Sequence, residues 1–481
     1  MAAGSGYRPT IGLEIHAELA TATKMFCACK NDPDEKRPNV NVCPICLAHP
    51  GTLPAANRAA VGHLMRIGAA LGGARADFSE FDRKSYFYPD IPKGYQISQF
   101  EHPFVAGGEL AGVAITRVHL EEDTARSAHG STTLATGEPA SLVDFNRAGV
   151  PLMELVTEPV IHDAQTAGRF ARELQQLLRA LGASHANLEK GQMRVEANIS
   201  VSKEAGKYGT KVEVKNLNSF RSVERAIAYE IERQGALLER GERVLQETRG
   251  WDEGRQQTFS QRLKEGSADY RYFPEPDLPK VLRAEVPAWS DAALAADLPE
   301  LPVARRARYE ARGARGEAAR VIAEEGALRE IFDSFLAQAR EDAELAALAA
   351  NYLTTDIAAL LEEGPPALAH FSGGRLLALL QMVRAGELSS RGAKEVIAVL
   401  AREGGEPAAI ARQRGLVQVQ DQEALAELAA KVIGANPGPA ADYRAGKEPA
   451  LQYLVGQAMK LSKGAGNPQK FQELLKKQLC G

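Results

Sequence analysis

Five separated segments of this chain place acidic, imidazole or lysine side chains on alternate positions among apolar residues. Alternation of this kind has the period of a β-strand, so the polar side chains of one segment share one face of a sheet. The residues concerned are Glu14 and His16, His119 and Glu121, Glu154, Glu196 and Asn198, and Glu213 and Lys215. We therefore predict a sheet with one face lined by carboxylates.

Carboxylates gathered in one place repel one another and raise each other's pKa unless a cation holds them together. Carboxylate oxygens are the ligands that Mg²⁺ prefers, and Mg²⁺ commonly bridges protein carboxylates to phosphates. The pattern thus predicts a magnesium and phosphate site. The alternative is an ordinary solvated sheet face, which explains any single segment but not the repeated glutamates of all five.

Four of the five cysteines form two close pairs, Cys27 with Cys29 and Cys43 with Cys46. Two such pairs are typical of a tetrahedral zinc site with four thiolates, and a closed site of this kind is structural. We predict bound Zn²⁺. The alternative is four unligated small side chains in a turn-rich hairpin. Cys480 stands alone and is expected to be inert.

The length of 481 residues exceeds one hydrophobic core and indicates about three domains. Hydrophobic residues make up 44% and charged residues 25% of the chain, as in folded water-soluble proteins. No apolar run is long enough to span a membrane and the N-terminus lacks a secretory signal, so a cytoplasmic location is expected. The formal net charge of −4 argues against a uniformly basic nucleic-acid binder.

Proline and glycine divide the chain. Prolines crowd residues 274–302, and a second break lies at 404–407. The predicted domains are 1–292, 293–403 and 404–481. In the first, strand-like segments alternate with helices predicted at 54–71, 163–181 and 219–240, each closed by a glycine. Beyond residue 292 the apolar residues recur with the period of an α-helix almost throughout, which predicts helices. The predicted fold class is α+β: a mixed or antiparallel sheet domain followed by two all-α domains.

Two basic features of the helical part would suit phosphates. Arg305, Arg308, Arg312 and Arg315 are spaced to share one helix face, and the C-terminal segment contains Arg444, Lys447, Lys460, Lys463, Lys470, Lys476 and Lys477. Both features are also compatible with ordinary solvated surface. RNA contact is a hypothesis for which the C-terminal segment is the better candidate.

Residues 81–100 combine aromatic and basic side chains between two prolines. Tyr88 is one of four aromatic residues here, and Lys93 is one of three cations. This composition suits stacking on a base or ribose while the cations meet phosphates. The alternative is an irregular loop held by aromatic packing.

Several nucleotide and hydrolase motifs are absent from the sequence. It contains no phosphate-binding P-loop, no dinucleotide-binding G-x-G-x-x-G after a strand and no G-x-S-x-G nucleophile elbow. Any nucleotide must therefore be held through metal and side chains, and a nucleophilic hydrolase is disfavoured.

Eight segments together resemble the B subunit of the glutamyl/aspartyl-tRNA amidotransferases, the GatB family. They are IGLEIHAEL, NVCPICLAHPGTLP, FDRKSYFYPDIPKGYQISQ, HLEEDTA, SLVDFNRAGVPLMELVTEP, VEANIS, VEVKNLNSF and DYRYFPEPDLP. The resemblance is close over residues 10 to about 280 and looser beyond. It implies a cradle domain at 1–292 with a zinc-binding hairpin, a helical domain at 293–403 and a YqeY-like tail domain at 404–481.

This resemblance implies a ligase that uses ATP and ammonia to convert Glu on glutamine tRNA, or Asp on asparagine tRNA, into the amide. It also implies a heterotrimer with an amidase-type A subunit, which supplies ammonia, and a small C subunit. The misacylated tRNA is expected on the helical and tail domains. ATP, Mg²⁺ and Zn²⁺ are the expected cofactors, and no membrane is involved.

Carried over to this sequence, the resemblance places the metal and phosphate cluster at Glu14, His16, Glu121, Glu122, Glu154 and Glu196. Glu14, Glu154 and either Glu121 or Glu122 are assigned to magnesium. His16 is either a ligand or an orienting hydrogen-bond partner, and the second role is the physically safer because Mg²⁺ prefers oxygen. Lys93 and Lys215 are expected to meet phosphates.

Two other functions are compatible with parts of the pattern. A stand-alone ATP-dependent carboxylate and amine ligase would use the same carboxylate face without RNA. An RNA-binding scaffold protein with a zinc-stabilised hairpin would need no magnesium cluster.

Overall fold

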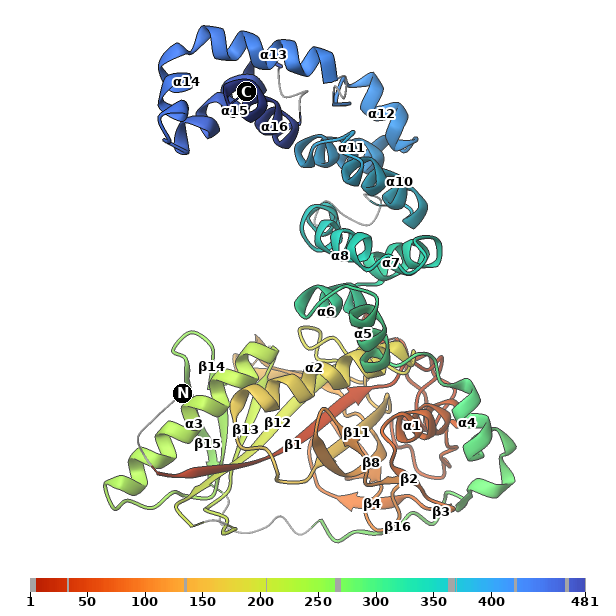
Figure 1. The fold of residues 1–481 in the computed structure, drawn as a ribbon. Helices are drawn as coiled ribbons and strands as arrows, with labels where there is room; N and C mark the ends of the chain where they lie inside the picture. Colours follow the sequence, from red (N-terminus) through yellow and green to blue (C-terminus); the bar gives the residue numbers. More distant parts are fainter. Residues whose placement is uncertain are drawn as a thin grey trace. The chain divides into compact units, whose positions relative to one another are not determined.

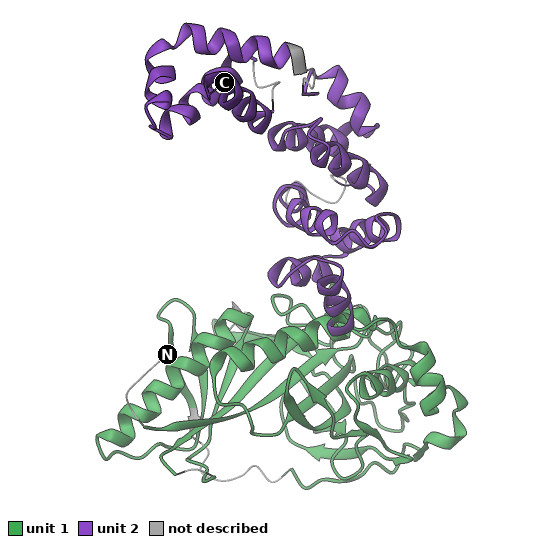
Figure 2. Cartoon of the chain, viewed as in Figure 1, with its two compact units in different colours: residues 1–302 green, residues 303–481 purple. Residues whose placement is uncertain are grey.

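The computed structural model describes residues 6–480 except 33, 134–135, 205, 264–269, 362–367, 369, 419–421 and 463–466. The chain forms two compact units, residues 1–302 and residues 303–481 (Figures 1 and 2). The first unit combines a large sheet with helices, and the described part of the second contains helices but no strand of a sheet. The expected α+β class with a following all-α region is confirmed.

A ten-stranded sheet forms the framework of the first unit, in the order β15-β14-β13-β12-β1-β11-β8-β6-β2 with β7 paired to β8. Its strands are β1 (Arg8–Glu18), β2 (Ala74–Arg75), β6 (Val105–Ala106), β7 (Glu109–Leu110), β8 (Val113–Glu122), β11 (Pro151–Thr157), β12 (Met193–Ser202), β13 (Val212–Leu217), β14 (Glu247–Asp252) and β15 (Gln257–Leu263). Neighbouring strands are antiparallel except β13 and β14, which are parallel. The sheet is therefore mixed, as predicted.

Three helices of the first unit match those predicted. They are α1 (Arg58–Ala70), α2 (Ala164–Ala180) and α3 (Phe220–Glu239). Each begins after a polar residue whose side chain accepts a hydrogen bond from the first helical turn. Each ends before a glycine with positive φ, the conformation that favours glycine as a terminator.

Helices α2 and α3 lie along one face of the sheet (Figure 1). Apolar residues at odd positions of β1, such as Leu13 and Ile15, are buried on this side with Leu174 of α2. Successive strand residues point to opposite faces, so the even positions of β1 point away from the helices. Glu14 and His16 occupy these positions.

Smaller strand groups border the sheet. Strands β4 (Asp82–Ser85), β5 (Tyr95–Ser98) and β16 (Phe273–Pro274) form a three-stranded sheet. Two further pairs are β9 (Arg126–Thr133) with β10 (Pro139–Asp144), and β3 (Phe78–Ser79) with β17 (Val281–Leu282). The short helix α4 (Asp291–Asp297) contributes Leu294 to the core of this unit.

The second unit contains two hydrophobic clusters. Its helices are α5 (Pro302–Ala311), α6 (Glu317–Glu324), α7 (Gly326–Gln338), α8 (Ala343–Tyr352), α9 (Ala358–Leu361), α10 (Gly373–Arg384), α11 (Ser390–Glu403), α12 (Pro407–Gln413), α13 (Gln422–Ala435), α14 (Pro437–Arg444), α15 (Pro449–Leu461) and α16 (Pro468–Cys480). One cluster spans residues 309–411 and the other 425–479. No helix in the described ranges is long and apolar enough to cross a membrane.

The predicted arginine stripe does not lie on one helix. Helix α5 ends at Ala311, so Arg315 lies beyond it. Gly313 has a φ of 114° and turns the chain at this point. Arg308 forms an ion pair with Asp333 at 2.9 Å. The prediction of a single shared helix face is therefore wrong.

In the C-terminal cluster, two of the predicted basic residues have partners within the chain. Lys447 forms an ion pair with Asp442 at 2.9 Å, and Arg444 donates a hydrogen bond to the carbonyl oxygen of Leu479. Lys463 lies outside the described residues. RNA contact by this segment stays a prediction.

A buried ion pair in β14 predicts a pH-dependent stability. Burial alone would raise the pKa of Glu247, but hydrogen bonds from Ser260 and Arg249 outweigh it and lower the pKa. We expect Glu247→Gln to lower the free energy of unfolding by about 1–3 kcal/mol at pH 7, since Arg249 loses the nearer of its two carboxylate partners, Glu247 and Glu230. A lowered carboxyl pKa stabilises the fold above the unfolded-state pKa, and this contribution is lost as the pH falls through the folded-state value.

Urea unfolding of wild type and Glu247→Gln at pH 7 and at pH 3.5 measures this effect. The difference between the two proteins should shrink at the lower pH. An equal difference at both pH values would contradict the assigned role of the Glu247 charge.

Candidate metal and phosphate site

Strand register brings the predicted polar residues into rows across the sheet. Strand β1 lies between β11 and β12. His16 pairs with Glu154 of β11 on one side and with Arg194 of β12 on the other, and Glu154 in turn pairs with His119 of β8. Glu14 lies opposite Glu196 in the neighbouring row. Four strands thus contribute side chains to one place on the face opposite the helices.

The side chains converge on His16. Its Nε2 atom lies 3.4 Å from Glu121 Oε1, 3.4 Å from Glu154 Oε2 and 4.0 Å from Glu14 Oε1. His119 Nε2 also lies 3.4 Å from Glu154 Oε2. Carboxylates from three separate strands therefore meet around two imidazole rings.

The pKa values in this cluster are coupled through these short distances. Burial raises the pKa of Glu14 to about 7, and the negative charges of Glu154 and Glu196 add to the rise. Burial opposes ionisation of Glu154 as well, but His119 and His16 outweigh it and hold its pKa well below the usual range. A bound divalent cation would lower the pKa of such a carboxyl group, because the positive charge stabilises the ionised form.

The cluster fits a divalent cation. Glu14, His16 and Glu154 offer one ligand atom each within 4.8 Å of one another, and so do His119, Glu121 and Glu154. The Nδ1 atoms of His16 and His119 are buried without a hydrogen-bond partner in the described structure. The donor set is carboxylate with imidazole, so oxygen ligands for Mg²⁺ are present. His16 is close enough to serve either as ligand or as orienting partner.

Glu121 and Glu122 are adjacent in β8 and point to opposite faces of the sheet. Glu121 joins His16 and also accepts a hydrogen bond from Ser98 Oγ at 3.3 Å. Glu122 instead forms an ion pair with Lys93 and accepts a hydrogen bond from the backbone amide of Ile97 at 3.0 Å. The structure therefore places Glu121, and not Glu122, with the His16 group.

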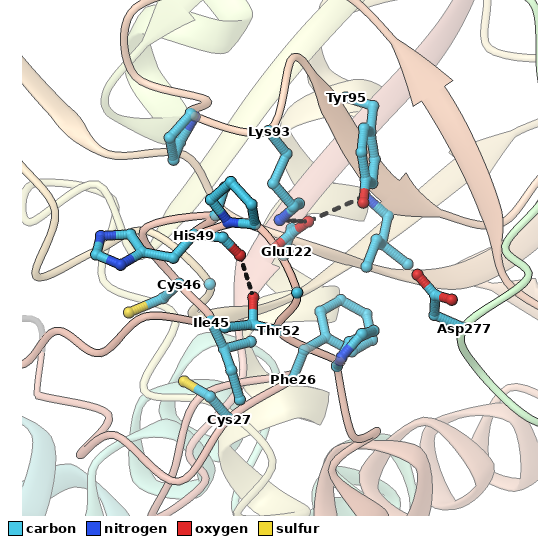
Figure 3. A pocket seen from close by; sticks show the side chains of 17 residues that line it. Phe26, Cys27, Ile45, Cys46, His49, Thr52, Lys93, Tyr95, Glu122 and Asp277 are labelled. Atoms are coloured by element: carbon cyan, nitrogen blue, oxygen red, sulfur yellow. Dashed lines mark hydrogen bonds and ion pairs between the residues drawn. The ribbon is translucent and has the colours of Figure 1, made fainter.

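Lys93 and Glu122 face a pocket of about 260 Å³ beside the cysteine hairpin (Figure 3). Cys27 and Cys46 form part of its wall. Tyr88 follows β4 and is 56% exposed, with the ring of Tyr86 as its neighbour at 6.0 Å. Tyr88, Lys93 and Glu122, which the sequence analysis placed in the site, thus lie outside the group of residues around His16.

Lys215 of β13 reaches the edge of the cluster. Its Nζ atom lies 2.9 Å from Glu196 Oε2 and 3.0 Å from Glu213 Oε1. Burial alone would lower the pKa of Lys215, but these two carboxylates outweigh it and raise the pKa. Lys215 and Glu196 therefore form one ion-paired unit beside Glu14, in which Lys215 keeps its positive charge.

Two further cations, Lys84 and Arg194, lie near the carboxylates and were not predicted as part of the cluster. Burial opposes the charge of Lys84, but Glu121 and Glu154 are among the groups that outweigh it and raise its pKa. Arg194 forms an ion pair with buried Asp123 at 3.2 Å. Lys84 lies in the aromatic and basic segment 81–100. Its position near Glu154 depends on where the small sheet that contains β4 packs.

The four predicted cysteine ligands also meet. Ligand atoms of Cys27, Cys29, Cys43 and Cys46 lie within 4.8 Å of one another, and the Cys43 and Cys46 sulfurs are 3.9 Å apart. This spacing suits four thiolates around one tetrahedral Zn²⁺. Burial raises the pKa of Cys29 to about 11. Four thiolates at such short distances require a cation, so the site fits Zn²⁺.

The fold and the site together define an α+β protein in which one sheet face carries carboxylate and imidazole groups suited to binding a divalent cation and phosphate. The same chain contains a closed site of four thiolates and a helical region. Comparison with known proteins then identifies the family. The family described as GatB/GatE catalytic domain matches residues 9–286, and the one described as GatB domain matches residues 332–479. The chain belongs to the GatB family.

Individual relatives of this family match nearly the full length of the chain. It is 44% identical over 485 residues to the B subunit of the aspartyl/glutamyl-tRNA(Asn/Gln) amidotransferase of Thermomicrobium roseum, covering 98% of this chain and 99% of the relative. The corresponding protein from Crocosphaera subtropica, which has the same name, is 41% identical, with coverage of 99% and 98%. The B subunit of a glutamyl-tRNA(Gln) amidotransferase of Physcomitrium patens, named as chloroplastic/mitochondrial, is 41% identical, with coverage of 99% and 86%.

Proposed function

We propose that this chain is the subunit of a tRNA-dependent amidotransferase that activates the side-chain carboxylate of Glu-tRNA(Gln) or Asp-tRNA(Asn). ATP phosphorylates that carboxylate, and ammonia then displaces phosphate to form the amide. The single observation that carries this proposal is the convergence of Glu14, Glu121 and Glu154 on His16 within 4.0 Å. Family membership supplies the substrate class.

The chemistry of the reaction explains why a group of carboxylates that can hold a cation is needed. A side-chain carboxylate is ionised at neutral pH and has no usable leaving group, so it must be phosphorylated before an amine can attack. Phosphoryl transfer depends on positioning and on neutralising phosphate charge. Bound magnesium supplies much of that neutralisation.

The chain's own residues would hold and orient the reactants. Glu14, Glu121 and Glu154 would hold the cation, and His16 would ligate it or fix the orientation of the two nearest carboxylates. Lys215 carries a positive charge beside Glu14 and is suited to meeting a phosphate group. We assign Glu196 to the positioning of Lys215, since its carboxylate is paired with that ammonium group.

Lys93 and Glu122 are proposed to act outside the metal cluster, since they form an ion pair facing the pocket beside the cysteine hairpin. Zn²⁺ held by the four cysteines has a structural role in this proposal. A closed site with four sulfur ligands has no open position for substrate. The hairpin that it would fix forms one wall of this pocket.

The remaining steps need partners. No glutaminase nucleophile is recognised in the sequence, so ammonia is proposed to come from an amidase-type A subunit, with a small C subunit completing a heterotrimer. The misacylated tRNA is proposed to contact residues 293–403 and 404–481 as well as the cradle domain at 1–292. We propose that the complex acts in the cytoplasm.

Reconstitution tests the proposal. We expect a complex of this chain with A and C subunits to form Gln-tRNA or Asn-tRNA from the misacylated tRNA only when ATP, Mg²⁺ and glutamine or ammonia are all present. Amide formation is measured by chromatography of the amino acid released from tRNA. The isolated chain should show no glutaminase activity, and detecting that activity would contradict the division of labour.

The two alternatives predict different results in the same assay. Amidation of free glutamate without tRNA would identify a stand-alone carboxylate and amine ligase. Binding of tRNA by the full complex without any consumption of ATP would identify an RNA-binding scaffold.

A further inference from the structure

One lysine of the first unit is buried beside the cysteine hairpin. Of the residues that the structure describes, Lys24 is the one lysine or arginine in the interior, with 1% of its surface exposed. It precedes Cys27 in the chain, and its backbone amide donates a hydrogen bond to the carbonyl oxygen of Cys29 at 2.9 Å. Lys24 belongs neither to the metal and phosphate cluster nor to the lysines assigned to phosphates.

The ammonium group of Lys24 lacks a carboxylate partner. Its Nζ atom donates one hydrogen bond, to the carbonyl oxygen of Phe145 at 3.1 Å, although an ammonium group has three N–H donors. No Asp or Glu of the described ranges forms an ion pair with it. Burying a charge is costly unless an opposite charge compensates it. An anion other than a carboxylate is therefore expected nearby.

The cysteine site lies next to this lysine. A Cβ atom at Gly149 would lie 3.6 Å from Lys24 Cδ and 3.7 Å from Cys46 Cβ. The lysine stem and Cys46 therefore pack against the same glycine. A hydrogen bond with Cys27 is the largest cause of the lowered pKa of Cys46, and the positive charge of Lys24 contributes to it. The charge of Lys24 thus acts on at least one of the four sulfurs.

Zinc binding makes the cysteine site more negative. Four thiols without a metal are neutral, whereas four thiolates around one Zn²⁺ carry a formal charge of −2. The protons that leave the sulfurs outnumber the positive charges that the cation brings. A fixed positive charge beside the sulfurs therefore favours the zinc-bound form, although it repels the free cation.

Two other cations of the hairpin cannot take this role equally well. Lys30 has a side chain that is 69% exposed and pairs with Asp32 at 2.7 Å, and Arg37 is 78% exposed and pairs with Glu35 at 3.0 Å. Water and salt screen exposed charges strongly, but they screen buried charges much less. The buried ammonium group of Lys24 is therefore the cation that acts most strongly on the sulfurs.

We propose that Lys24 is the internal counter-cation of the zinc site and that its charge strengthens the binding of Zn²⁺ by the four cysteines; this rests on the zinc site of the proposed function. Groups next to metal ligands typically change metal affinity by about 10–100-fold. The benefit is mutual. The thiolates compensate a charge that is otherwise buried with a single carbonyl acceptor.

Competition for Zn²⁺ with a chromophoric chelator, performed on the purified full-length chain at neutral pH under reducing conditions, tests the proposal. Lys24→Met keeps an unbranched stem but removes both the charge and the N–H donor. Lys24→Gln removes the charge but keeps a donor for the carbonyl oxygen of Phe145. Both variants should bind Zn²⁺ about 10–100-fold more weakly than the wild type.

Cobalt-substituted protein gives a second readout. A positive charge beside sulfur lowers the energy of the sulfur electrons, so the sulfur-to-cobalt charge-transfer absorption should move to longer wavelength in both variants. A side chain that only packs against Gly149 would not move this absorption. Circular dichroism shows whether each variant folds, and if Lys24→Met does not fold, Lys24→Gln carries both measurements.

Lys30→Met is the matched control, because Lys30 follows Cys29 directly but is exposed and paired with Asp32. Its affinity for Zn²⁺ should equal that of the wild type. An equal loss in this control would overturn the proposal, since any cation of the hairpin would then have the same effect.

Two further outcomes would overturn it. One is a wild-type affinity for Zn²⁺ in both Lys24 variants. The other is a loss confined to Lys24→Met, which would assign the effect to the hydrogen bond with Phe145 rather than to the charge. Wild-type protein that binds no zinc is a separate result, which would remove the zinc site itself.

Discussion

Replacing Glu154 with glutamine should reduce ATP-dependent phosphorylation of the acylated tRNA at least about 100-fold, the loss typical of removing a central electrostatic contact. Glu154 contacts both His16 and His119 at 3.4 Å and belongs to both sets of candidate metal ligands. Glutamine keeps the shape of the side chain but removes its charge. The effect should therefore appear in the chemical step and in Mg²⁺ affinity rather than in folding.

Single-turnover formation of the phosphorylated intermediate, together with Mg²⁺ titration of the complex, measures this change. Glu158→Gln is a suitable control, because Glu158 accepts a hydrogen bond from Thr116 near the surface, away from His16. Normal phosphorylation by the Glu154 variant would exclude the assigned role of the cluster.

Replacing Cys46 with serine should release the zinc and lower the stability of the first unit. Cys46 is the most buried of the four cysteines, 7% exposed, and its sulfur lies 3.9 Å from that of Cys43. Structural zinc contributes directly to folding free energy, and loss of one of four ligands abolishes tight binding. We expect the zinc content to fall from about one ion per chain to near zero, with a melting temperature lower by several degrees.

Metal analysis by mass spectrometry after purification under reducing, chelator-free conditions measures the first effect, and calorimetry measures the second. Cys480→Ser is the matched control, since Cys480 is exposed at the C-terminus. Wild-type protein without zinc under these conditions would refute the site.

Much of the first unit could be predicted from local sequence. Helices α1, α2 and α3 have polar residues at their starts and glycines at their ends, and both signals act within a few residues. The alternation in β1 likewise predicted which residues share a face. The prediction of one arginine stripe was wrong, because α5 ends at Ala311 and Gly313 turns the chain before Arg315.

The site could be predicted only in part. Alternation with His119 placed Glu121 on the carboxylate face, but the assignment of a magnesium ligand left Glu121 and Glu122 as alternatives. Their separation follows from the pairing of β8 with β11, which places Glu121 on the His16 side. The approach of Lys84 toward Glu154 is not visible in the sequence either, because it depends on how the small sheet of β4 packs.

Local signals were enough to predict the fold class, the three helices of the first unit and the chemical character of the site, because periodicity, capping and residue type depend on nearby residues only. Packing of the whole unit was needed to know which carboxylates meet and which ion pairs form beside them. These depend on register between strands that are more than 100 residues apart in the chain, such as β1 and β11. Only packing of the whole unit selects that register, because a shift by one residue would turn the buried face of each strand outward.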